Sequence, residues 1–151
     1  MPRKLILTNH QSPGDILMLT AAVRDLHGCN PGMFVTDVRT PCPDFWLNNP
    51  WITPLSESDP EVEVIRCHYP RVHMSNQRPY HFLHGFTGYL SEALGVPVEP
   101  LQFRADIHLS ASERYAGNEF EAELSGLPYW LIASGGKFDF TIKWWDPARY
   151  Q

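Results

Sequence analysis

The chain opens with an apolar strand that runs through a short polar loop into an amphipathic helix. Residues 4–8 read Lys-Leu-Ile-Leu-Thr, and residues 9–15 add the loop Asn-His-Gln-Ser-Pro-Gly-Asp. Apolar residues then recur at helical spacing from Ile16 to Leu26, which predicts a helix over residues 13–26 with one buried face. A strand followed at once by such a helix is the building unit of α/β folds with a parallel sheet.

The rest of the chain alternates between strands and helices in the same way. Gly28 and Gly95 are typical of helix ends, and Ser110 with Glu113 fits a capping box at a helix start. The alternation predicts a Rossmann-like α/β fold, with a mostly parallel sheet and helices on both of its faces. The expected strands span residues 4–8, 33–38, 62–67, 106–109 and 129–133, and the expected helices span residues 13–26, 44–47, 80–94 and 111–124.

Length and turn residues predict how the chain divides. The 151 residues are enough for one domain with a substantial core. Gly126-Leu-Pro128 reads as the close of that unit, because glycine and proline break regular structure. We expect a domain over residues 1–126 and the first strand and turn of an incomplete second domain over residues 127–151.

Charge and cysteine usage exclude several classes of protein. The net charge of −5 disfavours general nucleic-acid binding, so no nucleic-acid partner is expected. No apolar run approaches the ~20 residues that a membrane-spanning helix needs. Three widely spaced cysteines indicate neither a disulfide framework nor a zinc site, which favours the cytoplasm. The histidines between residues 68 and 84 lack a full ligand set, so we expect no metal.

Asp15 is the leading catalytic candidate because it sits at a strand-to-helix turn. Such turns lie at the carboxyl ends of parallel strands, where ligands bind in open α/β sheets. An ionised carboxylate there can act as general base on an acceptor hydroxyl. The structural alternative is a carboxylate that only stabilises the helix start. Ser12 and Gly14 shape the same loop, and Gly14 allows a ligand close to the backbone.

Two further segments carry candidate binding residues. A glycine-rich turn with basic neighbours can present backbone N–H groups and positive charge to a diphosphate; its residues are Ser134, Gly135, Gly136, Lys137 and Lys143. The alternative there is a surface turn with solvated lysines. The polar and aromatic region around residues 66–80 could bind an acceptor sugar, with Arg71 and Arg78 as its candidate contacts.

Three motifs together resemble the ADP-heptose glycosyltransferases, the heptosyltransferase-like enzymes of lipopolysaccharide synthesis. They are the Gly-Asp pair within residues 5–26, the Asn-Pro-Trp-Ile stretch within residues 48–52, and Gly-Gly-Lys followed by Lys-Trp-Trp within residues 132–150. They occur in the family's order and span nearly the whole chain. One departure is Asp146 before Pro147, which would partly offset the positive charge of Lys143.

The resemblance implies the amino-terminal half of a GT-B glycosyltransferase, with two facing α/β domains. Its reaction would be an inverting transfer of a sugar, a heptose if the resemblance extends to the donor, from a nucleotide diphosphate to lipopolysaccharide or another glycan. No metal or other cofactor is implied, Asp15 matches the proposed base, and Lys143 matches a phosphate-contacting lysine. We expect a cytoplasmic protein, either free in the cytoplasm or bound peripherally at the inner membrane.

Family enzymes bind the donor mostly on the second domain, so little activity is expected of these 151 residues alone. A second chain carrying the donor-binding half could then restore transfer. The competing interpretation is a non-catalytic α/β binding or scaffold domain, in which Asp15 is only a helix cap.

Overall fold

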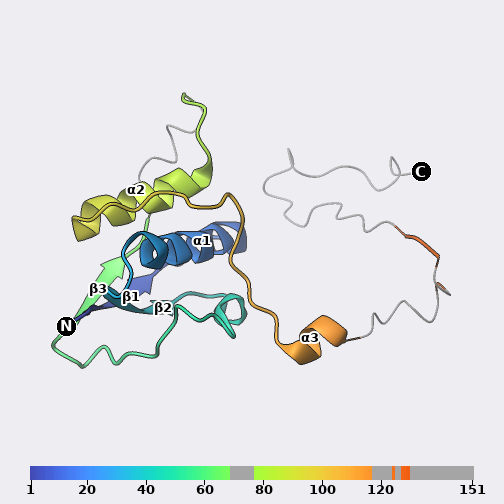
Figure 1. The fold of residues 1–151 in the computed structure, drawn as a ribbon, viewed down its shortest axis with the longest axis horizontal. Helices are drawn as coiled ribbons and strands as arrows, with labels where there is room; N and C mark the ends of the chain where they lie inside the picture. The colour runs from blue at the N-terminus through green and yellow to red at the C-terminus, as the bar shows by residue number, and fades with distance from the viewer. Residues whose placement is uncertain (69–76, 117–123, 125–126, 130–151) are drawn as a thin grey trace. The chain divides into compact units, whose positions relative to one another are not determined.

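The computed structural model describes residues 1–68, 77–116, 124 and 127–129. By its internal contacts the chain divides into two units, Met1–Arg114 and Tyr115–Gln151. Most of the second unit lies outside the described residues, so the expected boundary near residue 126 stays a prediction. Seven elements follow one another along the described chain (Figure 1): β1 Arg3–Thr8, α1 Pro13–Cys29, β2 Phe34–Arg39, the 3-10 helix η1 Pro43–Trp46, β3 Val62–Arg66, α2 Phe82–Leu94 and α3 Ala111–Tyr115.

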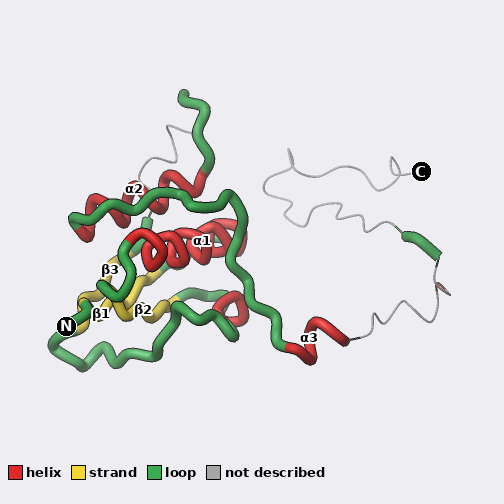
Figure 2. Tube along the Cα trace, in the orientation of Figure 1, coloured by secondary structure: helices red, strands yellow, loops and turns green. Residues whose placement is uncertain are grey.

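The strands form a three-stranded parallel sheet with β1 in the centre, in the order β2-β1-β3. The register aligns Leu5 with Thr36 on one side and with Glu63 on the other. The order follows from burial, because β1 is the most apolar strand and Leu5, Ile6 and Leu7 are fully buried. The sheet and its helices confirm the α/β class (Figure 2).

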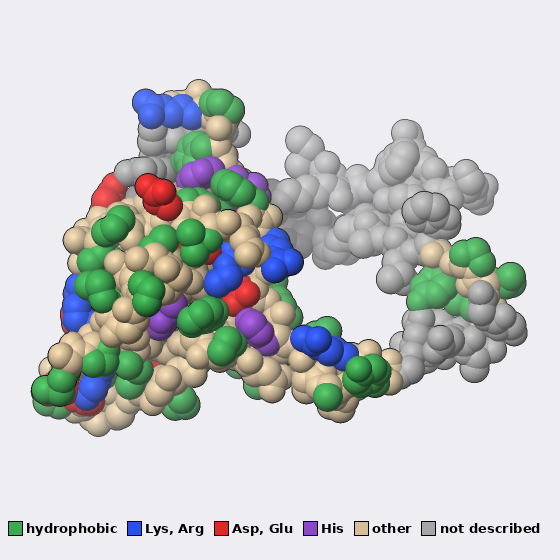
Figure 3. Space-filling view, viewed as in Figure 1, with side chains coloured by type: hydrophobic (Ala, Val, Ile, Leu, Met, Phe, Trp, Pro, Cys, Tyr) green, Lys and Arg blue, Asp and Glu red, His purple; other side chains and the backbone are tan. Residues whose placement is uncertain are grey.

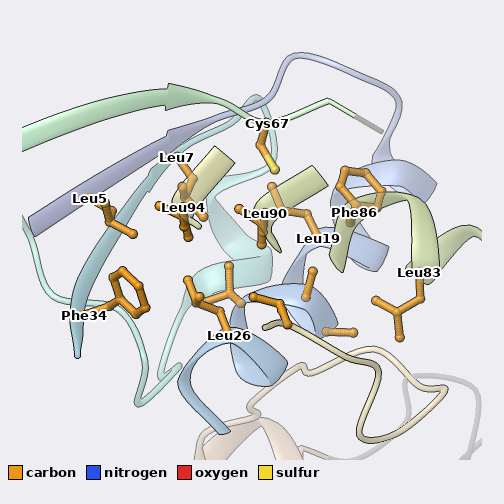
Figure 4. Close-up of a cluster of buried hydrophobic side chains, with 14 of the residues drawn as sticks. Leu5, Leu7, Leu19, Leu26, Phe34, Cys67, Leu83, Phe86, Leu90 and Leu94 are labelled. Carbon is orange, nitrogen blue, oxygen red and sulfur yellow. The ribbon is translucent and has the colours of Figure 1, made fainter. Parts of the chain in front are cut away.

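The core lies between one face of the sheet and the two long helices. Leu5 and Leu7 of β1 pack against α1 and α2, with Phe34 of β2 closing one end (Figure 4). Burying each such side chain contributes roughly 1.5–3 kcal/mol. The core side chains of the helices are Ile16, Leu19, Val23 and Leu26 from α1 and Leu83, Phe86, Leu90 and Leu94 from α2. The helical spacing expected for α1 is therefore confirmed.

The expectation of helices on both faces is wrong for the part of the chain that the structure describes. Both long helices pack on the Leu5 face, and Val64 on the opposite face is 55% exposed. The connection between β2 and β3 forms only the one-turn helix η1. Instead of a crossover helix, irregular chain of that connection covers part of the second face, where Ile6 is buried and the Leu55 N–H donates to Asp37.

Of the two glycines expected to end helices, Gly95 does so and Gly28 does not. Gly95 ends α2 in the left-handed conformation, with φ of 69°, as expected of a C-cap glycine. Gly28 does not end α1, which continues to Cys29 and is followed by Asn30. A Cβ at Gly28 would collide with Cδ1 of Leu101. Gly28 is therefore explained by close packing rather than by helix termination.

Residues 96–109 form an extended segment along α1, which we call the strap. Side chains of α1 hold it: the guanidinium of Arg24 donates to the carbonyls of Gln102 (2.7 Å) and Arg104 (2.9 Å), and Thr20 Oγ1 bonds the N–H of Asp106 (3.0 Å). The expected strand over residues 106–109 is wrong, because these backbone groups bond side chains instead of a neighbouring strand.

The capping box predicted at residue 110 is confirmed. The Glu113 N–H donates to Ser110 Oγ at 3.2 Å, and Glu113 Oε2 accepts from the Ser110 N–H at 2.7 Å. The helix that it starts, α3, spans Ala111–Tyr115. The strand expected over residues 129–133 falls almost wholly outside the described residues.

Candidate functional site

The strand order reverses at the centre of the sheet. The chain passes from β1 to β2 on one side and then returns to place β3 on the other side of β1. The loops that leave β1 and β3 both lead to helices on the same face, α1 and α2, and they meet at the carboxyl edge of the sheet, which is the edge where open α/β sheets bind ligands. The segment 9–15 after β1 and the segment from Cys67 after β3 form this edge.

Asn9 links the loop after β1 to the segment after β3 by hydrogen bonds. Its buried side chain donates from Nδ2 to the carbonyl of Cys67 (3.1 Å) and to Oε1 of Gln11 (3.0 Å). Its Oδ1 accepts the N–H of Gln11 at 2.7 Å. The sequence analysis missed this role, although an asparagine directly after a strand and before Ser-Pro-Gly is a turn signal.

Asp15 lies in the first turn of α1, where the sequence placed it. Its backbone N–H donates to the carbonyl of Ser12 at 2.9 Å, and its side chain is partly buried. The extended backbone of Ser12 makes it the N-cap residue, but its hydroxyl makes no capping hydrogen bond. The exposed Ser12 hydroxyl therefore does not serve as a hydrogen-bonding cap of α1.

Gly14 is not required by the fold at its position. It is exposed in the first turn of α1, and a Cβ built there would meet no atom of the described residues within 4 Å. Its backbone is also outside the left-handed region that favours glycine. Alanine would suit this helical position better, so the glycine is unexplained by packing or conformation.

Only part of the predicted site falls within the described residues. Ser12, Gly14 and Asp15 come together at the start of α1, and Arg78 is exposed shortly before α2 begins. Because α2 follows β3, its start belongs to the same edge of the sheet as the start of α1. The other candidates lie outside the described residues, namely Arg71, Ser134, Gly135, Gly136, Lys137 and Lys143.

Two histidines at the start of α2 have a structural role that the sequence analysis did not anticipate. Nδ1 of His81 accepts the N–H of Leu83 at 3.2 Å, and Nδ1 of His84 accepts the N–H of His81 at 3.1 Å. Both rings also contact the Phe103 ring of the strap, with centroid distances of 5.5 and 5.2 Å. Their capping bonds explain this pair without a ligand.

Cys67 is unsuited to nucleophilic chemistry despite its place at the edge. Burial raises the pKa of its thiol to about 12, so the thiolate is scarce at neutral pH. The three cysteines are all free thiols. Among the described residues, no group of three histidine, cysteine or acidic side chains is placed to hold a metal ion.

The face of the molecule drawn in Figure 3 carries charges of both signs. On the face drawn in Figure 3, acidic, basic and hydrophobic side chains of the described residues are interspersed. In addition, no described helix combines the length and apolar character needed to cross a membrane.

Comparison with known proteins assigns no family. No model of a known protein family matches the chain. No curated protein and no solved structure is similar enough to count as a relative. The function therefore has to be argued from the residues at the carboxyl edge of the sheet.

Proposed function

We propose that this chain is the acceptor-side half of a glycosyltransferase that uses a nucleotide-diphosphate sugar, with Asp15 as its general base. The observation that carries the proposal is the position of Asp15 in the first turn of α1, at the carboxyl end of the central strand of the sheet. The sequence resemblance to the ADP-heptose glycosyltransferases supplies the reaction class and the GT-B arrangement.

The chemistry follows from what an acceptor hydroxyl needs. As the hydroxyl oxygen attacks the anomeric carbon of the donor, a carboxylate within hydrogen-bond reach takes its proton. The bond between that carbon and the diphosphate breaks, and the nucleotide diphosphate leaves with the electron pair. Attack from the opposite face inverts the anomeric centre. Lys143 and the turn over residues 134–137 would stabilise the leaving diphosphate.

Gly14 supports the acceptor role of this loop. Because neither the conformation nor the packing of α1 requires a glycine there, the missing side chain is best explained by a molecule that approaches the backbone. Ser12, Arg71 and Arg78 would contribute polar contacts to the same sugar. We infer lipopolysaccharide core or another glycan as acceptor, and a cytoplasmic site of action.

A binding or scaffold domain is the alternative, and it has one observation in its favour. A carboxylate in the first turn of a helix interacts favourably with the helix dipole whether or not it is catalytic. On this view Asp15 affects stability alone.

The two proposals are separated by a transfer assay on the protein as its native host makes it, with any partner chain retained. ADP-heptose serves as donor and lipopolysaccharide core oligosaccharide as acceptor. We expect Asp15→Asn to lower kcat by about 10²–10⁴-fold, the usual contribution of a general base. Asp44→Asn is the matched control, because Asp44 is also an acid in the first turn of a helix, η1, and is exposed.

Gly14→Ala tests the acceptor contact in the same assay. The variant should fold at least as well as the wild type, since alanine is the better helix former. We expect its KM for the acceptor to rise while its unfolding midpoint is unchanged or higher. An Asp15→Asn variant that keeps wild-type kcat, or a wild-type protein without transfer, would contradict the proposed function.

A further inference from the structure

A concave site that is separate from Asp15 lies at the carboxyl ends of β1 and β2. It is an open groove of about 480 Å³, within the size range of small-molecule sites. It is bounded by the loop after β1, the end of β2 and the segment that leads through η1. Most of its lining is apolar and consists of Val38, Pro41, Pro43, Trp46, Leu47 and Ile52.

The walls of the groove are held in place before any ligand binds. Trp46 is 7% exposed, and its Nε1 donates to Oγ1 of Thr40 at 3.0 Å. Ile52 is fixed by a parallel bridge to Thr36 of β2. The two prolines restrict the backbone between β2 and η1. A preformed wall lowers the entropic cost of binding a small molecule.

The charges at the groove neutralise one another. Oδ2 of Asp37 accepts the Leu55 N–H at 2.7 Å and pairs with Nη1 of Arg39 at 2.8 Å. The same guanidinium donates to the carbonyls of Val38 and Leu55. Neither residue therefore offers an unpaired charge to a ligand.

Two polar lining side chains keep donor capacity within the described part of the chain, the Thr40 hydroxyl, which accepts from Trp46, and His10. His10 is exposed, and it has no hydrogen-bond or ion-pair partner among the described residues. In either tautomer an imidazole carries an N–H, so it can donate to an accepting group on a ligand. The groove thus offers an apolar floor and, in His10, an exposed hydrogen-bond donor at its rim.

We propose that this groove binds a small amphipathic molecule, an apolar ring system that carries one acidic, hydrogen-bond-accepting head group. The ring lies against the apolar floor around Val38 and Ile52, and the head group accepts from His10. The site is independent of the proposed glycosyl transfer, since none of the residues assigned to that reaction lines it.

Two fluorescent probes test the proposal on the full chain. Anilinonaphthalene sulfonate has the ring system and an acidic head, and N-phenyl-1-naphthylamine has nearly the same rings without the head. We expect both to bind saturably at one site. His10→Ala should weaken binding of the sulfonate several-fold and leave the affinity for the uncharged probe unchanged.

A matched pair of leucines locates the site. Leu47 lines the groove and is 53% exposed, and Leu109 lies outside it at 50% exposure. Leu47→Glu should weaken both probes by about tenfold or more, because a carboxylate would have to be desolvated beneath the ring. Leu109→Glu should change neither affinity. Equal effects of the two leucine variants, equal effects of His10→Ala on the two probes, or absence of saturable binding would overturn the proposal.

Discussion

Replacement of Arg24 by methionine should test how the strap is held on α1. The Arg24 guanidinium is 2.8 Å from Oδ1 of the fully buried Asp25, and it donates to two carbonyls of the strap. The other Asp25 oxygen, Oδ2, makes no hydrogen bond within the part of the chain that the structure describes. Removing one member of a buried ion pair leaves an uncompensated charge and typically costs about 3–5 kcal/mol. We expect a loss of that size for Arg24→Met.

Urea unfolding followed by circular dichroism measures this loss at pH 7. The control is Arg66→Met, because Arg66 is exposed on β3 and its replacement should cost less than about 0.5 kcal/mol. The double variant Arg24→Met with Asp25→Asn should recover part of the loss, since no buried charge remains. A cost for Arg24→Met below about 1 kcal/mol would refute the reasoning.

The pH dependence of the unfolding free energy tests the Arg24–Asp25 pair a second time. Burial raises the pKa of Asp25, and Arg24 opposes that rise. A raised carboxyl pKa means that stability is fully present below the unfolded value of about 3.9 and is lost as pH rises through the folded value. Without Arg24 the pKa of Asp25 rises further. Arg24→Met should therefore cost more at pH 7 than at pH 5, and an equal cost at both would contradict this account.

Two further predictions concern the packing of α1. Gly28→Ala should gain more helix stability, up to about 0.5–1 kcal/mol, when Leu101 is also alanine, because the exposed Leu101 side chain must otherwise rotate away from the new methyl group. A thermodynamic cycle by urea unfolding measures this, and equal gains in both backgrounds would count against it. Burial lowers the pKa of His27, which stacks on Trp51 at 5.3 Å. Its contribution to stability is therefore present above pH ~6.5 and is lost as pH falls below that value. The wild type should lose more stability than His27→Gln between pH 7 and pH 5, and parallel losses would disprove the role of His27.

The elements that could be predicted from sequence are those specified by local chemistry. The apolar period over α1, the glycine that ends α2 and the Ser110–Glu113 capping box each act within a few residues, and each was predicted correctly. The parallel pairing of the strands follows from their alternation with helices. These features need no knowledge of distant contacts.

The features that were missed depend on contacts between distant residues. The strap is held by Arg24 and Thr20, about 80 positions away in the sequence, so residues 106–109 pair with side chains rather than a strand. Gly28 appeared to be a helix end because its contact with Leu101 cannot be read locally. Within the described part of the chain, helices cover one face of the sheet because the β2–β3 connection forms a single helical turn.

The candidate site also contains residues that local sequence predicts and residues that depend on distant contacts. The start of α1 with Ser12, Gly14 and Asp15 could be placed from the strand–loop–helix pattern alone. The role of Asn9 and the groove beside His10 could not, because both depend on which strands become neighbours.

The most direct test of the central claim is the ratio of kcat between Asp15→Asn and the wild type, with ADP-heptose as donor. We expect a ratio of about 10⁻² or lower, as when a general base is lost, with a loss of stability no larger than the ~0.3–1 kcal/mol that the helix dipole accounts for. A ratio near one would contradict it and would leave Asp15 with a role in the helix start alone.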